Sequence, residues 1–139
     1  MPRHSKKQTL FSGSPAILLC IAMAKGSASH KLLQMVVDTG ASFTTIPVET
    51  ATRLGLDPSR SKERVSIVTA NGLIYAPLIE IPVFGALGIE LRNFKVACHD
   101  LPAQSHVHGL LGRDFLLHFP PYQAFEKAIL AIAPQFWKS

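Results

Sequence analysis

The chain is poor in cysteine, in charged residues and in long hydrophobic runs. Its 139 residues include two cysteines, and both stand in apolar stretches without the spacing of a metal site. We therefore expect Cys20 and Cys98 to be buried free thiols of a protein from a reducing compartment. The apolar run at residues 16–24 is too short to span a bilayer. The sequence has no internal repeat and no low-complexity tract.

The charge content is low as well. Charged residues make up 17% of the chain and hydrophobic residues 47%, a balance typical of compact globular proteins. At this length we expect one domain with a real core. The formal net charge is +5, but much of the excess lies at Arg3, Lys6 and Lys7, and the other basic residues form no stripe interleaved with aromatics. No nucleic-acid partner is expected.

One acidic residue stands at the end of an apolar run. Residues 35–37 are expected to form a buried strand, and Asp38-Thr39-Gly40 the sharp turn that ends it. A carboxylate in this place costs free energy unless a partner satisfies it or a reaction uses it. Gly40 allows a close backbone approach, and Thr39 can hydrogen-bond to the main chain. Taken alone, the motif is more simply explained as an ordinary Asx turn with a solvated carboxylate.

A second segment changes this interpretation. Leu110-Leu111-Gly112 places two bulky apolar residues before a glycine, and a short helix is expected to follow it. In this order and spacing, the two segments resemble the retropepsin-like aspartic proteases. That family pairs an Asp-Thr-Gly-Ala-(Ser/Asp) loop with a later apolar-apolar-Gly segment that lies beneath it. The resemblance extends from about Ser14 to Pro134 and implies an all-β fold, a closed barrel or sandwich with one or two short helices.

Many short apolar segments at close spacing also predict an all-β sandwich or barrel. Strands are expected at residues 16–24, 31–38, 42–46, 79–84, 89–91, 94–98, 110–111 and 128–132, a hairpin at 64–81, and helices at 48–54 and 113–118. The domain is expected to span residues 14–135, between a flexible basic arm at 1–13 and a tail at 136–139.

Asn71-Gly72 between two apolar runs is a strong signal for a β-hairpin. The resemblance implies that this hairpin, residues 65–76, is the flap that closes over a bound peptide. Its tip, Ala70-Asn71-Gly72, would then offer backbone groups to an extended substrate, as strand-addition recognition requires. Some relatives carry an aromatic residue on the flap. Tyr75 is the nearest candidate, although the sequence does not place it at the tip.

Hydrolysis of a peptide bond by acid–base chemistry needs two carboxyl groups that share a proton. This chain has one Asp-Thr-Gly, and Asp57, Asp100 and Asp114 stand in contexts that cannot build the same turn. The sequence therefore predicts a homodimer in which each chain contributes one Asp38. His106-Val107-His108 has no third ligand at metal spacing, so neither a metal nor a cofactor is expected.

The resemblance also implies roles for the residues around this aspartate. Asp38-Thr39-Gly40 would form the catalytic group, with the threonine of each chain bracing the other chain. Ala41-Ser42 would lie against the substrate, and the serine would also place a hydroxyl near the catalytic carboxylate. Leu110-Leu111-Gly112 would support the loop from beneath, because its glycine allows tight packing.

The last segment departs from the pattern of the family. Ala124 precedes Phe125 where relatives often carry an acidic residue, and Pro120-Pro121 is expected to end the preceding helix. Retroviral members pair their termini in an intersubunit sheet, and residues 128–132 and the N-terminal arm could take this part here. Neither departure touches the carboxylate.

The sequence thus predicts an aspartic endopeptidase that acts on a peptide or protein substrate. The alternative is a peptide-binding or dimerisation module of the same fold without significant proteolysis. The intact Asp-Thr-Gly-Ala-Ser argues against that alternative.

Residues 16–24 also allow two interpretations. They could be the core of a signal peptide with a cleavage site at Ala22-Met23-Ala24, or the first strand of the domain. The strand is favoured, because the resemblance implies a hairpin that leads into the Asp38 strand, with residues 26–29 as its loop. A cytoplasmic protein without stable membrane association is expected, and a secreted or periplasmic protein is the alternative.

Overall fold

The computed structural model describes residues 17–69, 71–101 and 107–137, with residues 129–137 described as helical backbone only. The strands are β1 (Leu19–Lys25), β2 (His30–Val37), β3 (Thr45–Ile46), β4 (Arg64–Thr69), β5 (Gly72–Ala86), β6 (Ile89–Cys98) and β7 (Gly109–Leu111). The helices are α2 (Val48–Arg53), the 3-10 helix η1 (Pro58–Arg60), α3 (Arg113–Leu116) and α4 (Pro120–Trp137).

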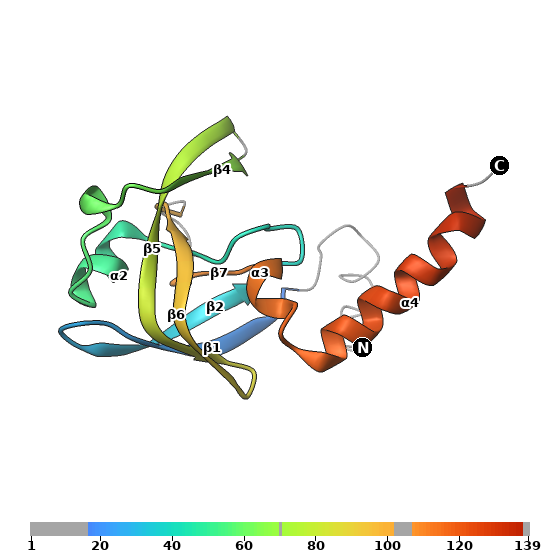
Figure 1. The fold of residues 1–139 in the computed structure, drawn as a ribbon, viewed down its shortest axis with the longest axis horizontal. Coiled ribbons are helices and arrows are strands. Elements are labelled where there is room, and N and C mark those ends of the chain that lie inside the picture. The colour runs from blue at the N-terminus through green and yellow to red at the C-terminus, as the bar shows by residue number, and fades with distance from the viewer. Residues whose placement is uncertain (1–16, 70, 102–106, 138–139) are drawn as a thin grey trace, which may run out of the picture.

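The strands form one sheet that closes on itself. Their order is β1-β2-β7-β3-β6-β5-β4, and β1 also pairs with β5, so the sheet closes into a barrel (Figure 1). β4 pairs with the first half of β5 beyond the closed part, and the two strands extend from the barrel as a hairpin. The predicted all-β barrel with short helices is confirmed.

The first two strands form the predicted hairpin around residues 26–29. Side chains alternate across it as in a sheet with one buried face: Ala22 and Met35 are fully buried, whereas Ile21 and Leu32 are exposed. The strand interpretation of residues 16–24 therefore holds for the part that the structure describes. β1 lies between β2 and β5, so it closes the barrel.

Three phenylalanines pack against one another at the hydrophobic core. The ring of Phe115 from α3 meets those of Phe84 and Phe94 edge to face, at centroid distances of 5.5 and 5.8 Å. The helix that follows β7 thus supplies a core residue, which ties its position to the packing of β5 and β6.

Both cysteines are free thiols, Cys98 buried and Cys20 half-buried, and burial raises the pKa of Cys98 to about 12.

The middle of the chain has fewer and longer strands than predicted. The segments expected at 79–84, 89–91 and 94–98 belong to two strands, because β5 runs without a break from the Asn71-Gly72 turn into the barrel. The turn between β5 and β6 is Leu87-Gly88, whose φ angles of 54° and 79° fit a tight hairpin of two residues. Asn93 also has a positive φ, 54°, but β6 continues through it.

The predictions for the C-terminal segment are wrong. Residues 128–132 lie in the helix α4 and not in a strand, and Pro120-Pro121 begins this helix instead of ending α3. Proline is well tolerated in the first turn of a helix, where its missing N–H would have had no partner. A short apolar run does not distinguish a strand from a buried or docked helix. No helix in the described part of the chain is long and apolar enough to cross a membrane.

Other boundaries differ by a few residues or lie outside the description. The strand expected at 42–46 is reduced to β3, because residues 42–44 form an irregular loop. The flexible arm at residues 1–13 lies outside the described residues. The boundary expected before residue 136 falls inside α4.

Candidate active site

Asp38 follows the last residue of β2 at the point where three chain segments meet. Val37 pairs with Leu111 of β7, and its N–H donates to the carbonyl of Leu18 over 2.8 Å. The N–H of Asp38 donates to the carbonyl of Leu111 over 2.9 Å. The end of β2 is therefore held by hydrogen bonds on both sides, so the side chain of Asp38 projects from a backbone that is fixed in place.

The turn after Asp38 is the Asx turn expected from its sequence. The N–H of Gly40 donates to Oδ1 of Asp38 over 2.9 Å, and the N–H of Ala41 donates to the Asp38 carbonyl over 3.1 Å. Asp38 is half-buried, whereas Thr39 and Gly40 are exposed at the tip of the loop. The carboxylate thus has one backbone donor and still opens toward solvent.

Leu110-Leu111-Gly112 lies against this loop, as predicted. A Cβ on Gly112 would come within 2.7 Å of the carbonyl carbon of Phe43 and 2.8 Å of the Ala41 oxygen, so glycine is required there. The next N–H, of Arg113, donates to the Ala41 carbonyl over 2.8 Å. The loop and the segment beneath it are therefore packed backbone to backbone.

Thr44 and Asp114 form a buried link that the sequence did not predict. Oδ1 of Asp114 accepts from the N–H of Thr44 over 2.9 Å, from its hydroxyl over 2.7 Å and from the N–H of Phe115 over 2.8 Å. The Thr44 hydroxyl oxygen also accepts from the N–H of Gly112 over 3.1 Å. Burial raises the pKa of Asp114, and the hydrogen bonds from Thr44 and Phe115 offset part of that rise.

This link had one signal in the sequence. Asp114 stands in the first turn of α3, where an acidic side chain commonly accepts from helix N–H groups. The long-range partner, Thr44, has no such signal, because its hydroxyl becomes fully buried only when β7 packs against the loop.

A cleft of about 610 Å³ opens above Asp38. Its floor comes from the Asp38 loop and from Leu110, and its opposite wall comes from the β4–β5 hairpin. The lining residues are Asp38, Gly40, Ala41, Ser42, Phe43, Thr45, Ser66, Ile67, Val68, Thr69, Asn71, His99, Asp100, Leu101 and Leu110. The fold thus brings the Asp-Thr-Gly loop and the predicted hairpin to the same cleft.

Not every predicted site residue lines this cleft. Thr39 is exposed at the edge of the loop, and Leu111 and Gly112 are buried beneath it. Gly72 begins β5 with a φ of 111°, a conformation that favours glycine. Ala70 lies outside the described residues.

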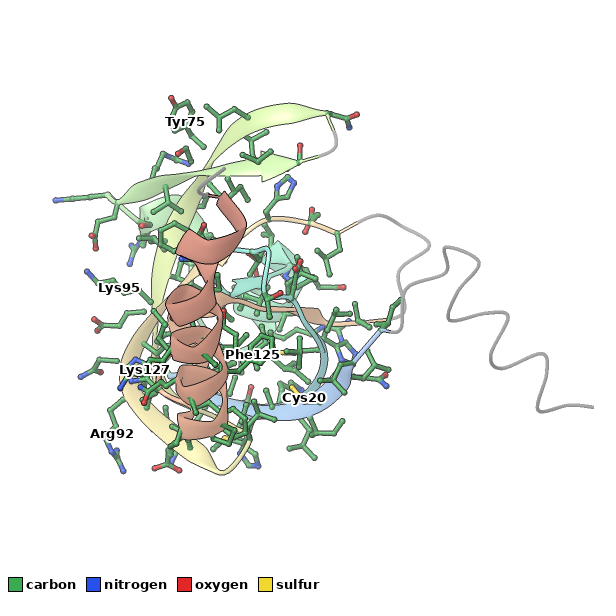
Figure 2. All side chains as sticks on the ribbon, turned by 90° about the vertical axis from the view of Figure 1, so that its right-hand side faces the viewer. Cys20, Tyr75, Arg92, Lys95, Phe125 and Lys127 are labelled. Atoms are coloured by element: carbon green, nitrogen blue, oxygen red, sulfur yellow. The ribbon has the colours of Figure 1, made fainter. Side chains whose placement is uncertain are left out.

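Tyr75 lies on the outer side of the hairpin. Figure 2 shows its side chain extending away from the barrel, and 68% of it is exposed. Leu73, which lies two residues before it on the same side of β5, is 58% exposed. The aromatic residue that the resemblance suggested for the flap therefore does not reach into the cleft.

His99 and Asp100, which the sequence did not indicate as site residues, also line the cleft. The N–H of His99 donates to the carbonyl of Ile46 over 3.0 Å, and Oδ1 of Asp100 accepts from the N–H of Val48 over 3.0 Å. β3 and β6 pair in parallel, which brings residues after Cys98 to the cleft. This pairing joins distant parts of the chain, so no local pattern could have indicated it.

The other candidate groups lie elsewhere. Asp57 caps η1 by accepting from the N–H and the hydroxyl of Ser59, whose hydrogen bonds lower the pKa of this carboxylate. Nδ1 of His108 accepts from the N–H of Gln34 over 2.8 Å, and His106 is outside the described residues. Within the described ranges, no group of three or more His, Cys, Asp or Glu side chains could hold a metal ion.

Comparisons with known proteins agree with this arrangement. Residues 24–118 match the family model described as "gag-polyprotein putative aspartyl protease". An uncharacterised Sinorhizobium protein encoded in the cobV 5' region is 36% identical over 88 residues, which cover 62% of this chain and 36% of that protein. The chain thus spans about a third of the length of that relative.

A solved structure is similar as well. The crystal structure of a retropepsin-like aspartic protease from Rickettsia conorii superposes with a TM-score of 0.56 and 27% sequence identity. The superposition covers 74% of this chain and 79% of the Rickettsia chain. The family match includes β2, the Asp38 loop, both strands of the hairpin and β7. The chain belongs to the retropepsin-like aspartic proteases.

Proposed function

We propose that this chain is an aspartic endopeptidase whose active site forms when two copies bring their Asp38 carboxyl groups together. The observation that carries the proposal is the position of Asp38, half-buried on the floor of a cleft whose opposite wall is a β-hairpin. One carboxyl group cannot both activate water and protonate the scissile carbonyl. Asp100 also lines the cleft, but its carboxylate accepts a hydrogen bond from the N–H of Val48 at the start of α2. We therefore assign the second carboxyl group to Asp38 of another copy.

Two carboxyl groups held close together share one proton, as is established for aspartic proteases as a class. The ionised group takes a proton from water, and the protonated group donates to the carbonyl oxygen of the peptide. In this proposal, Asp38 of each copy supplies one of the two groups. The N–H of Gly40, which donates to Oδ1 of Asp38, fixes the orientation of that carboxylate.

The remaining site residues would bind the substrate and the second copy. Thr39 is exposed next to Asp38, where it can contact the equivalent loop of the partner. Ala41, Ser42 and Asn71 line the cleft on opposite sides, so an extended peptide between them would meet backbone groups of both walls. In this proposal the β4–β5 hairpin is the flap.

The test is cleavage of a denatured mixed-protein substrate across pH 4–7, with wild type and Asp38→Asn at matched dimer concentration. We expect Asp38→Asn to lower the rate by at least about 1000-fold, because a group that transfers protons in the transition state is lost. Circular dichroism should show the same fold for both proteins. Wild-type activity should also fall steeply on dilution.

A second candidate function is a binding or dimerisation module of the same fold. A wild-type protein that is demonstrably dimeric and cleaves no substrate would support this alternative and contradict the proposal. The intact Asx turn at Asp38 favours the protease, because the carboxylate is oriented and opens to the cleft.

We also propose that the chain functions in the cytoplasm. Cleavage after Ala24 would remove nearly all of β1, which closes the barrel between β2 and β5. Mass analysis of the mature N-terminus tests this point. A mature chain that begins at Lys25 would contradict it.

A further inference from the structure

The helix α4 leaves the barrel and extends away from it (Figure 1). Tyr122, in its first turn, packs against the barrel core, whereas the next aromatic residue, Phe125, is 63% exposed. Phe125 and Lys127 extend from opposite sides of the helix in Figure 2. An exposed phenylalanine opposite a lysine is the arrangement of an amphipathic helix that lacks its partner.

The sequence of α4 has the spacing of a packed helix along its length. Apolar residues recur at intervals of three and four: Tyr122, Phe125, Ile129, Ile132 and Phe136. Such a stripe keeps one face of a helix against another surface. In proteins, most of the stability of a helix comes from the packing of its apolar face.

A second apolar surface is exposed in the described part of the chain. It consists of two residues just before β1, two residues of β1 and one residue of β2, and we call it the β1 strip: Ile17, Leu18, Leu19, Ile21 and Leu32, which are between 44% and 69% exposed. Scattered single apolar residues are normal on a surface, but a contiguous group marks an interaction site.

Both surfaces begin next to the Asp38 loop. The carbonyl of Leu18, in the β1 strip, accepts from the N–H of Val37, the residue before Asp38. Arg113, at the start of α3, donates to Ala41 in the same loop, and α4 begins shortly after α3 ends. A second copy that brings its Asp38 to this place therefore comes close to both surfaces.

We propose that α4 is a dimerisation arm that packs on the β1 strip of the partner copy, in exchange for the partner's α4. The inference rests on the proposed function, since the active site is incomplete without a second copy. A two-fold axis at the Asp38 loops presents the strip of each copy to the helix of the other, so one exchange covers all four surfaces. Phe125 is the aromatic anchor of this contact.

This arrangement differs from the intersubunit sheet that the resemblance suggested for residues 128–132. A helix has no free backbone edge along its length and cannot add to a sheet. It buries side chains instead, so its contribution to dimerisation should be sensitive to a charge at Phe125 and insensitive to backbone pairing.

The test uses two charge variants, alone and mixed, with the dimer dissociation constant measured by analytical ultracentrifugation. Phe125→Glu places a carboxylate on α4, and Ile21→Lys places an ammonium group on the β1 strip. Each variant alone puts a charge into both contacts of its homodimer, and we expect each to weaken dimerisation at least about tenfold. Thermal melts verify that the monomers are folded.

The mixture provides the decisive comparison. In a heterodimer of the two variants, one contact pairs the carboxylate introduced by Phe125→Glu with the ammonium group introduced by Ile21→Lys, and the second contact is wild type. Mixing should therefore restore dimers. If α4 instead packs on the partner's α4, Ile21→Lys will dimerise normally and mixing will restore nothing, which overturns the proposal. Val48→Glu, on α2 at the opposite side of the barrel, is the control and should leave dimerisation unchanged.

The outcomes also separate this inference from the proposed function. If the variants dimerise like wild type while Asp38→Asn still abolishes cleavage, the arm is refuted and the protease stands. If the variants dissociate as expected but concentrated wild type cleaves nothing, the arm stands and the protease is refuted.

Discussion

The two walls of the cleft are built in opposite ways. The Asp38 loop is held by backbone hydrogen bonds from three segments and by the buried link between Thr44 and Asp114. The β4–β5 hairpin extends from the barrel, and the side chain of Val68 on it is 85% exposed. Local stability follows buried contacts, so the loop should open only with the whole domain and the hairpin far more easily.

This difference in rigidity fits the different functions proposed for the two walls of the cleft. A group that transfers protons must be held in place before the substrate arrives, because its orientation contributes directly to the rate. A wall that encloses a long peptide must first let it enter. The four predictions that follow probe the rigid wall first and the hairpin last.

The largest effect is expected at Gly112. In Gly112→Ala, the new Cβ would stand 2.7 Å from the Phe43 carbonyl carbon, so the loop or β7 must move. We expect a loss of at least about 3 kcal/mol in the free energy of unfolding, measured by urea denaturation. Gly85→Ala is the matched control, since its nearest neighbour is the Ile89 oxygen at 3.4 Å. Equal losses in both variants would contradict the tight packing of the loop on β7.

The next effect is expected at Thr44. Thr44→Val keeps the shape of the side chain but removes the hydroxyl that donates to Asp114 and accepts from Gly112. A buried carboxylate and a buried N–H each lose a partner, so we expect a loss of about 2–3 kcal/mol in the free energy of unfolding. Thr44→Ser, which keeps the hydroxyl, should recover more than half of it. A serine variant as unstable as the valine variant would show that the methyl group matters more than the link.

The sequence predicted the local parts of this site and missed its long-range parts. The Asp38 turn and the Asn71-Gly72 hairpin each follow from a few adjacent residues, whose conformational preferences act locally. The packing of Gly112 under the loop joins distant residues, and it was expected only from the resemblance to the family. The link of Thr44 to Asp114 and the presence of His99 in the cleft depend on the parallel pairing of distant strands. No short pattern carries that information.

The prediction for the C-terminal segment was wrong for a different reason. The apolar run in residues 128–133 carries no period that separates a strand from a helix over so few residues. The strand was expected from this short apolar run, and the family, whose retroviral members pair their termini between subunits, suggested only a role for it. The repeat of apolar residues over the whole of α4 would have indicated the helix, but the prolines at its start were interpreted as the end of the preceding helix.

A smaller effect is expected from pH. Burial raises the pKa of Asp114 in the folded state above the value of an unfolded aspartate, so the folded protein binds this proton more tightly. The stabilising contribution is therefore complete below the ordinary pKa, about 4, and is lost as the pH rises through the raised value. We expect Asp114→Asn to gain stability relative to wild type as the pH rises above about 4, and thermal melts at several pH values measure this gain.

Asp57 is the control, because its pKa is shifted in the opposite direction to that of Asp114. Its hydrogen bonds with Ser59 lower its pKa, so its contribution is present at neutral pH and is lost as the pH falls through the lowered value. Asp57→Asn should therefore lose stability relative to wild type as the pH rises toward the ordinary value of about 4, below the range in which Asp114 acts. The same slope for both variants would contradict the assignment of burial as the dominant cause at Asp114.

The smallest effect on global stability is expected at the hairpin. Gly72 has a φ of 111°, so Gly72→Ala strains the turn, but a Cβ there would meet no atom within 4 Å. Because the hairpin lies beyond the closed barrel, we expect the free energy of unfolding to change by less than about 1 kcal/mol. Amide hydrogen exchange should nevertheless accelerate at residues 65–69 and 73–76 and stay unchanged in β2 and β7. Faster exchange in β2 as well would mean that the two walls open together, and the hairpin could not then act as an independent flap over a fixed Asp38.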